Sequence, residues 1–388
     1  MKKIFFFIII FINILLFNNS KLDTVASKAD SDLQISSKAA VLIEPYGKQI
    51  LYDKNANKKL FPASMTKIVT LKLVLDAIEN KQIDWKQGIR TSKYASKMGG
   101  SQIYLAEGEE MSVEDLFKSV AIVSANDAAV SLAEAVAGSE EQFVVKMNQE
   151  VKKLDLKNTN FVNCTGLPVE NHYTTPYDIG ILGINLINKY EDVILKYTSC
   201  YEDYVRQDSP KKFWLVNTNK LIKRYPEIDG LKTGWTNEAG YCLTCTMKKD
   251  NFRLVSVVMG AENTDMRSKD TLNLLHYGFN NYQKINLFSK NQILKRINNI
   301  RLNPSKQVVI IPNDVIVVMP KESADIKFEY EVVLDNRKIN SFHTANIGKL
   351  SVYDKNHNLI TETCLNLMQD NKKASFWNII VELIKKIF

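Results

Sequence analysis

Apolar residues recur with different spacings along the chain, and each spacing predicts a different kind of element. In residues 64–80 they recur every three or four positions, which is typical of a helix with one buried face. Pro62 precedes this segment and fits a helix start. Residues 111–157 have a similar pattern, and Ser112 and Asp115 are spaced as a capping box. We therefore expect both segments to be mainly helical.

Strand patterns flank these helical segments on both sides. Residues 39–44 and 48–52 predict a hairpin across a Pro-Tyr-Gly turn. Residues 240–247 and 252–260 predict a second hairpin, followed by a helix over 267–278. Strands at both ends of a region, with helices between them, favour one antiparallel sheet with a helical insertion. The expected fold class is therefore α+β.

Beyond residue 288 only short strand patterns remain. They cover residues 307–311, 315–319, 326–334, 349–353 and 359–364. The chain is also longer than one hydrophobic core usually needs. We therefore expect two domains, residues 31–285 with the sheet and helices, and residues 288–367 as a small β-sandwich-like domain.

The first 29 residues have the pattern of an export signal. A basic start, Met1-Lys2-Lys3, precedes a nearly unbroken apolar run over residues 4–17. This run is shorter than the roughly 20 apolar residues that a membrane span needs. We expect residues 1–29 to be a signal peptide of an exported protein, with an uncleaved anchor as the alternative.

The last residues, 372–388, combine aromatic and basic side chains with a helical spacing. One face of such a helix would hold Phe376, Ile380, Leu383 and Ile387, and the opposite face Asn378, Glu382 and Lys385. An amphipathic helix of this kind is suited to lie in a membrane interface. We expect it to attach the protein peripherally to the extracytoplasmic face of the cell membrane, and packing on its own domain is the alternative.

Composition and charge exclude several classes of function. Of the 388 residues, 45% are hydrophobic and 24% are charged, as in globular proteins. The net charge of +8 is spread along the chain without a long basic block, so no nucleic-acid partner is expected. A mild preference for anionic wall polymers or lipid headgroups and an ordinary solvated surface both stay open.

Cysteine and histidine residues give no sign of a metal site or a disulfide framework. The five cysteines are scattered, and Cys242 and Cys245 lie in a predicted strand, where residues three apart point to opposite faces. We interpret them as two packed strand cysteines. The four histidines show no ligand spacing, so neither a metal nor another cofactor is expected.

Ser64-Met-Thr-Lys67 is the first segment that indicates catalysis. A serine and a lysine three positions apart share one face of a helix, so the amine can reach the hydroxyl. Serine is a weak nucleophile until a base takes its proton, and lysine can be that base when burial lowers its pKa. The pattern alone is not specific, because it occurs by chance in most large proteins.

Two further triplets make the signal specific. Ser124-Ala-Asn126 lies in the helical region, and Lys232-Thr-Gly234 begins a predicted strand. A glycine at a strand edge lets a substrate backbone approach closely, and the lysine adds charge where an anion would bind. Each triplet alone is more often structural, but the three together in this order point to one catalytic site.

With these motifs the chain resembles the penicillin-recognising serine hydrolases. It is most similar to their low-molecular-weight D-Ala-D-Ala carboxypeptidases, peptidase family S11. The similarity covers residues 31–285, and the matching segments are 62–67, 100–105, 107–111, 124–128, 217–221 and 229–236. It implies a β-lactamase/transpeptidase-like catalytic domain, and the β-domain and amphipathic tail also fit the family's architecture.

The resemblance implies a role for each motif residue. Ser64 would attack the D-Ala-D-Ala carbonyl and form an acyl-enzyme, with Lys67 as the base. Ser124 and Lys232 would pass the proton to the departing D-alanine, and Asn126 would contact the substrate amide. The substrates would be peptidoglycan stem peptides that end in D-Ala-D-Ala, and β-lactam antibiotics would acylate the same serine.

Other residues would bind the substrate. The backbone N–H groups of Ser64 and Trp235 would form the oxyanion hole, in which each donor is worth about 10²–10³-fold in rate. Arg267 matches the family's arginine for the terminal carboxylate, and Lys232 and Thr233 would assist it. Trp235 is larger than the residue expected after Lys-Thr-Gly, and its ring would narrow the cleft.

Several alternatives stay open. Glu170 is not expected to be a deacylating carboxylate, since its surroundings do not follow the β-lactamase pattern, and His172 is interpreted as a structural loop residue. A β-lactamase would release its penicilloyl adduct rapidly, whereas a carboxypeptidase would keep it. A wall-binding protein with a decayed site and an unrelated serine–lysine protease are less consistent with three intact motifs.

Overall fold

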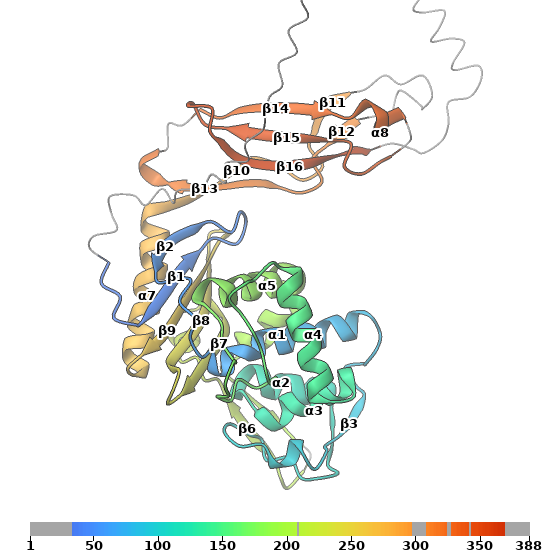
Figure 1. Ribbon diagram of the computed structural model, residues 1–388, viewed down its shortest axis with the longest axis vertical. Coiled ribbons are helices and arrows are strands. Elements are labelled where there is room, and N and C mark those ends of the chain that lie inside the picture. Colours follow the sequence, from blue (N-terminus) through green and yellow to red (C-terminus); the bar gives the residue numbers. More distant parts are fainter. Residues whose placement is uncertain (1–32, 208, 297–307, 324–326, 341–342, 369–388) are drawn as a thin grey trace, which may run out of the picture.

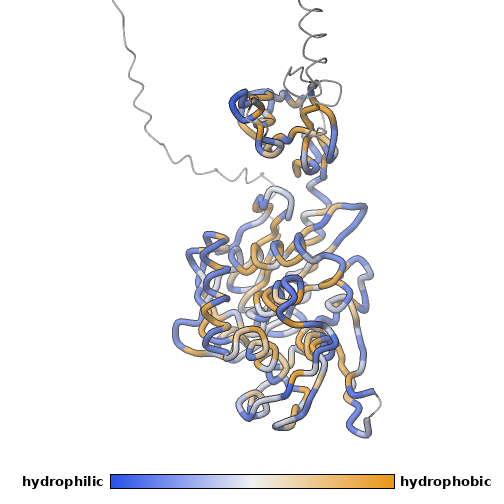
Figure 2. The backbone as a smooth tube through the Cα atoms, turned by 90° about the vertical axis from the view of Figure 1, so that its right-hand side faces the viewer, coloured by the Kyte–Doolittle hydropathy of each residue, from blue (hydrophilic) through white to orange (hydrophobic). Residues whose placement is uncertain are grey.

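The computed structural model describes residues 33–207, 209–296, 308–323, 327–340 and 343–368. The expected signal peptide and the expected amphipathic tail both lie outside these residues. The described chain forms a larger α+β body and a smaller β body beyond one end of it, as Figure 1 and Figure 2 show from two sides.

A five-stranded antiparallel sheet lies at the centre of the larger body. Its strand order is β2-β1-β9-β8-β7, so β2 and β7 form the edges. The strands are β1 (Ala39–Ile43), β2 (Ile50–Lys54), β7 (Ile228–Thr236), β8 (Gly240–Lys249) and β9 (Phe252–Ala261). Because β1 pairs with β9 from the other end of the region, the predicted sheet with a helical insertion is confirmed.

Helices cover both faces of this sheet (Figure 1). Helix α7 (Thr264–Asn281) packs on one face, and α5 (Pro176–Thr198) packs on the other. Strand β9 is buried along its whole length. Its Val257 belongs to the core on the α5 side, and its Leu254 and Val258 belong to the core on the α7 side. The alternation follows from the two-residue period of a strand.

The insertion between the strands is mainly helical. Its helices are α1 (Lys67–Glu79), α2 (Val113–Val123), α3 (Asn126–Ala137), α4 (Glu140–Lys153) and α5. The helix predicted from residue 64 begins as a 3-10 turn, η2 (Ala63–Thr66), and continues as α1. The predicted capping box is present, because Ser112 Oγ accepts a hydrogen bond from the Asp115 N–H at 3.1 Å.

Short elements complete the insertion. Strands β3 (Gly88–Arg90) and β4 (Glu110–Ser112) form one pair, with the turn η3 (Ala95–Lys97) between them in the chain. Strands β5 (Glu202–Val205) and β6 (Phe213–Val216) form a second pair, which we call the arm. The short helix α6 (Leu221–Arg224) leads back to β7.

The smaller body is built from strands around its own apolar core. Strand β10 (Tyr282–Phe288) directly follows α7, spans the expected domain boundary and pairs with β13 (Val315–Pro320). A second sheet has the order β11-β12-β16-β15-β14. Its elements are β11 (Ile293–Arg296), β12 (Val308–Ile310), β14 (Glu329–Leu334), β15 (Gly348–Tyr353) and β16 (Leu359–Met368), with η5 (Lys321–Ser323) and α8 (Asn336–Asn340) between strands.

Two further sequence interpretations concern these elements. Cys242 and Cys245 are free, buried and packed into cores on opposite faces of β8, as predicted for strand cysteines. In the part of the chain that the structure describes, no helix is long and apolar enough to cross a membrane.

Candidate active site

Ser64 and Lys67 meet at the junction of η2 and α1. The Lys67 Nζ donates a hydrogen bond to Ser64 Oγ at 3.0 Å and another to the Thr165 carbonyl oxygen at 2.6 Å. Lys67 is completely buried, whereas Ser64 is half-buried and accessible. The Thr165 carbonyl accepts this second hydrogen bond and thereby orients the amine toward the Ser64 hydroxyl.

Burial lowers the pKa of Lys67 from 10.5 to about 7, and Cys164 and then the charge of Asp127 act in the opposite direction. A large part of Lys67 is therefore neutral near pH 7. A neutral amine has a lone pair that can accept the Ser64 proton, so the pair meets the requirement for an activated serine.

Ser124 and Asn126 lie where α2 ends and α3 begins. Ser124 has a left-handed backbone with φ of +66°, a conformation that non-glycine residues adopt at a cost and that is found preferentially at functional sites. The Asn126 side-chain amide donates to the Gly99 carbonyl at 2.6 Å. Ser124 Oγ and Asn126 Oδ1 are buried and have no hydrogen-bond partner among the described residues, so both can bind a substrate.

Strand β7 brings the third motif to Ser64 along the edge of the sheet. A Cβ atom at Gly234 would lie 2.9 Å from the Pro62 carbonyl oxygen and 3.2 Å from the Met65 nitrogen. The glycine therefore permits close approach of the nucleophile turn itself, where the sequence suggested only a substrate backbone. Lys232 is buried, and burial, then the charges of Lys67 and Arg267, hold its pKa well below the ordinary value.

The other residues expected to bind the substrate are Thr233 and Trp235 near the end of β7 and Arg267 on α7. Thr233 Oγ1 donates to Thr218 Oγ1 at 2.7 Å. The Trp235 side chain is 54% exposed, and its ring packs against Tyr241. Arg267 on α7 is only 5% exposed, yet no carboxylate of the described chain pairs with it, and its Nε has no acceptor. A buried cation without a partner is costly, so this position favours an anionic ligand.

Glu170 and His172 do not take part in this constellation. Glu170 is exposed. His172 is buried behind the nucleophile turn, where Nε2 lies 2.9 Å from Thr66 Oγ1. The structure thus agrees with the interpretation of His172 as a structural loop residue.

Sequence reasoning missed three contributors to the site. The Thr165 carbonyl is a backbone group and carries no residue-type signal. Thr218 approaches Thr233 only through the tertiary fold. Asp127 had a local signal, since it follows Asn126 at a helix start, and its carboxylate accepts from the Ile103 and Leu105 N–H groups at 3.2 and 3.0 Å.

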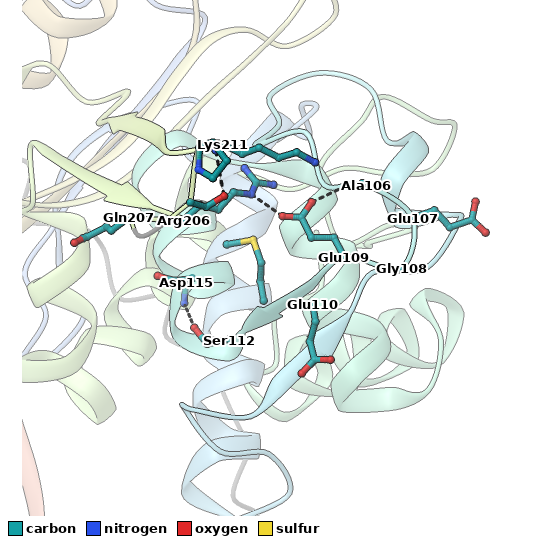
Figure 3. Close-up of a pocket in the computed structure, with 13 residues that line it drawn as sticks. Ala106, Glu107, Gly108, Glu109, Glu110, Ser112, Asp115, Arg206, Gln207 and Lys211 are labelled. Carbon is teal, nitrogen blue, oxygen red and sulfur yellow. Dashed lines mark hydrogen bonds and ion pairs between the residues drawn. The ribbon is translucent and has the colours of Figure 1, made fainter.

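A cavity of about 930 Å³ lies apart from this constellation, between residues 106–112 and residues such as Arg206 and Lys211 that connect the two strands of the arm (Figure 3). Arg206 crosses it, with Nε 2.6 Å from Glu109 Oε1 and a guanidinium nitrogen 2.9 Å from the Ile103 carbonyl. None of the motif residues line the cavity. We therefore interpret the ion pair as a brace between the arm and the loop beside Asn126. Within the described ranges, no cluster of three or more His, Cys, Asp or Glu residues could hold a metal ion.

Comparison with known proteins agrees with the motifs and the fold. The family model for D-alanyl-D-alanine carboxypeptidase matches residues 24–263. The D-alanyl-D-alanine carboxypeptidase DacF of Bacillus subtilis is 41% identical over 379 residues, which are 97% of this chain and 96% of the relative. DacC of Escherichia coli is 34% identical over 260 residues, or 65% of this chain and 63% of that protein.

A solved structure of penicillin binding protein 5 from Haemophilus influenzae superposes with a TM-score of 0.73 at 28% identity, covering 87% of this chain and 98% of that one. The fold and the serine–lysine site define a penicillin-recognising serine hydrolase. Within that class, the chain belongs to the D-alanyl-D-alanine carboxypeptidase family, peptidase family S11. Membership favours the carboxypeptidase over the β-lactamase and non-catalytic alternatives.

Proposed function

We propose that the protein removes the terminal D-alanine from peptidoglycan stem peptides that end in D-Ala-D-Ala, through an acyl-enzyme on Ser64. The observation that carries this proposal is the 3.0 Å hydrogen bond between Lys67 and Ser64, combined with a Lys67 pKa lowered to about 7. Together they supply a nucleophile and its base at neutral pH.

In the first step Lys67 takes the Ser64 proton, and Oγ attacks the carbonyl carbon of the penultimate D-alanine. The N–H groups of Ser64 and Trp235 stabilise the oxyanion that forms. The peptide bond then breaks, and Ser124 and Lys232 deliver a proton to the nitrogen of the departing D-alanine. Water later cleaves the ester, and Ser64 recovers its proton.

The unpaired polar atoms of the site determine which substrate fits. Asn126 Oδ1, which has no partner in the described chain, would accept a hydrogen bond from the amide of the bound peptide. Arg267, assisted by Lys232 and Thr233, would bind the terminal carboxylate that D-Ala-D-Ala presents. The exposed Trp235 ring would narrow the substrate cleft. The same groups accommodate β-lactams, and a solved relative at 32% identity, penicillin-binding protein D2 of Listeria monocytogenes, has an ampicillin-bound form.

The proposed location of the protein in the cell rests on the residue patterns of segments 1–29 and 372–388. The basic and apolar start (1–29) supports export, and the amphipathic tail (372–388) supports peripheral attachment to the extracytoplasmic face of the membrane. Deletion of residues 372–388 should move the protein from the membrane fraction to the soluble fraction. A truncated protein that stays membrane-bound would refute attachment through the tail.

Labelling with a fluorescent penicillin tests the proposed activity. We expect wild type to be labelled, Ser64→Ala to remain unlabelled, and wild type to release D-alanine from a peptide that ends in D-Ala-D-Ala. An unlabelled wild type would refute an acyl-enzyme on Ser64. Labelling without release of D-alanine would leave penicillin binding without carboxypeptidase activity.

A further inference from the structure

His172 is held on three sides behind the nucleophile turn. Only 1% of its surface is exposed. Its Nδ1 accepts a hydrogen bond from the Val162 N–H at 3.1 Å, and its Nε2 lies 2.9 Å from Thr66 Oγ1. Phe161 packs edge-on against the ring with 5.6 Å between centroids.

The bond from Val162 determines which ring nitrogen carries the proton. A backbone N–H can only donate, so Nδ1 must present its lone pair and Nε2 must be protonated. Burial and the nearby charge of Lys67 lower the pKa of His172 to about 4, so the ring is neutral at physiological pH. Nε2 therefore donates to Thr66, and neither nitrogen is free to act as a base.

Thr66 connects this hydrogen bond to the catalytic pair. It is the last residue of η2 and the residue before Lys67. The turn contains Ala63 with φ of +47°, a conformation that a residue with a Cβ keeps only when its surroundings impose it. The hydrogen bond to His172 is the one side-chain hydrogen bond of Thr66 within the described residues.

Residues 163–172, which we call the backing segment, support the turn from behind. Gly166 lies so close that a Cβ there would come within 2.9 Å of Thr66 Oγ1 and into the Ala63 carbonyl. The Thr165 carbonyl accepts a hydrogen bond from Lys67 Nζ, and Thr70 Oγ1 donates one to the Cys164 carbonyl at 2.7 Å. Thr165 and Cys164 use their backbone carbonyls in these contacts. In the His172–Thr66 hydrogen bond, by contrast, a side chain of the backing segment binds the turn itself.

We propose that His172 is a positioning residue for acylation, which acts through Thr66 to hold the Ser64–Lys67 turn against the backing segment. It contacts neither the substrate nor the reacting atoms. The inference rests on the proposed function, because it concerns the rate at which Ser64 attacks. Small misplacements of a nucleophile have large kinetic effects, up to about 10²-fold for 1 Å.

Two substitutions of His172 separate its two hydrogen bonds. His172→Gln places an amide N–H near the position of Nε2 and so keeps the donor to Thr66. His172→Asn places a carbonyl near Nδ1, which keeps the acceptor for Val162 and removes the donor. We expect acylation by fluorescent penicillin to slow by about 10-fold to 10²-fold in His172→Asn and to stay close to wild type in His172→Gln. His276→Ala, an exposed histidine on α7, serves as the matched control.

A double substitution tests whether the effect passes through Thr66. Thr66→Val should slow acylation about as much as His172→Asn, and the combined variant should be no slower than either. Thermal unfolding of each variant shows that the folded protein is being assayed. Equal slowing by His172→Gln and His172→Asn, or multiplied effects in the double variant, would overturn the inference alone. An unlabelled wild type would instead overturn the proposed function, and the inference with it.

Discussion

The candidate site contains two groups of buried polar side chains, which differ in how completely they are hydrogen bonded. Behind the turn, Thr66, Thr70 and His172 all have partners in the described chain. The second group, which we call the unpaired group, consists of Ser124, Asn126 and Arg267, and each of these has a buried atom that finds no partner in the described part of the chain. Buried unpaired atoms cost stability, so the protein keeps them where a ligand would satisfy them.

This difference separates residues that hold the site from residues that bind the substrate. Replacing a paired residue should cost stability, because its partner is left unsatisfied. Replacing Ser124 or Arg267 should cost activity and leave the unfolding free energy unchanged or higher, whereas Asn126 also donates a hydrogen bond to the Gly99 carbonyl, which its replacement would break. The predictions below test that separation, beginning with the largest effect.

Lys67 and Lys72 are two buried lysines on α1. We expect the replacement of Lys67 to reduce activity and the replacement of Lys72 to reduce stability. Lys67→Ala should slow acylation by about 10³-fold, because it removes the base. Lys72 is 4% exposed and lies 2.7 Å from both Asp76 and Glu150. Lys72→Ala should lower the free energy of unfolding by about 3–5 kcal/mol but leave acylation of the folded protein unchanged. Penicillin labelling and urea unfolding measure both. Acylation of Lys67→Ala at the wild-type rate would refute its role.

Arg253 and Arg267 are two buried arginines that also differ in expected role. Arg253 should stabilise the fold, and Arg267 should bind the substrate. Arg253 is 4% exposed and pairs with Asp229 at 2.8 Å and Glu191 at 2.9 Å. Arg267 is 5% exposed and has no ion-pair partner among the described residues. Arg267→Met should lower kcat/KM on a peptide with a free terminal carboxylate by about 10²-fold. Its unfolding free energy should stay the same or rise by about 1 kcal/mol. Arg253→Met should instead destabilise by about 3–5 kcal/mol.

A peptide amidated at its terminus supplies the control for Arg267. Because the amide lacks the charge, its slow hydrolysis should respond little to Arg267→Met. If both peptides lost activity equally, or if Arg267→Met were as unstable as Arg253→Met, the assignment of Arg267 to the carboxylate would be wrong.

Sequence patterns predicted the motif residues and the sheet because both depend on short spacings. The three-residue interval of Ser64 and Lys67 and the alternation in β8 and β9 are local properties. Helix α5 was missed for a physical reason. It contains Gly180 and Gly183, which are poor helix formers, and a Cβ at Gly180 would lie 2.8 Å from Ile43 Cδ1. Close packing on the sheet required the glycines that obscured the helical pattern.

The hydrogen-bonding state of each site residue could not be predicted from the sequence. Whether a buried arginine is paired depends on which side chains the fold brings to it. Arg253 meets Asp229 through the β7–β8–β9 sheet, and nothing in the spacing distinguishes it from Arg267. Likewise, His172 and Thr66 are joined across more than a hundred residues of chain. The motifs therefore identify the catalytic atoms, and the tertiary contacts show which residues position them.

The pH dependence of acylation tests the state of Lys67. Only neutral Lys67 can take the Ser64 proton, so the rate should rise about tenfold per pH unit up to its pKa of about 7 and then level off. The folded-state pKa is below its ordinary value of 10.5. The unfolded chain therefore binds the extra proton between these values, and the contribution of Lys67 to unfolding free energy rises with pH over that window. A rate that is flat from about pH 5 to 9 would contradict the prediction.

The smallest expected effect concerns Asp127, whose charge favours protonated Lys67. Asp127→Asn removes that charge and keeps an oxygen for the Leu105 N–H. The pKa of Lys67 should fall, so the rising limb of the acylation profile should move to lower pH by less than about one unit. Glu109→Gln removes a carboxylate from the loop that contains Leu105. Glu109 pairs there with Arg206 at 2.6 Å (Figure 3). That variant should leave the limb in place, and an equal displacement in both variants would show that loop disorder, and not charge, moves it.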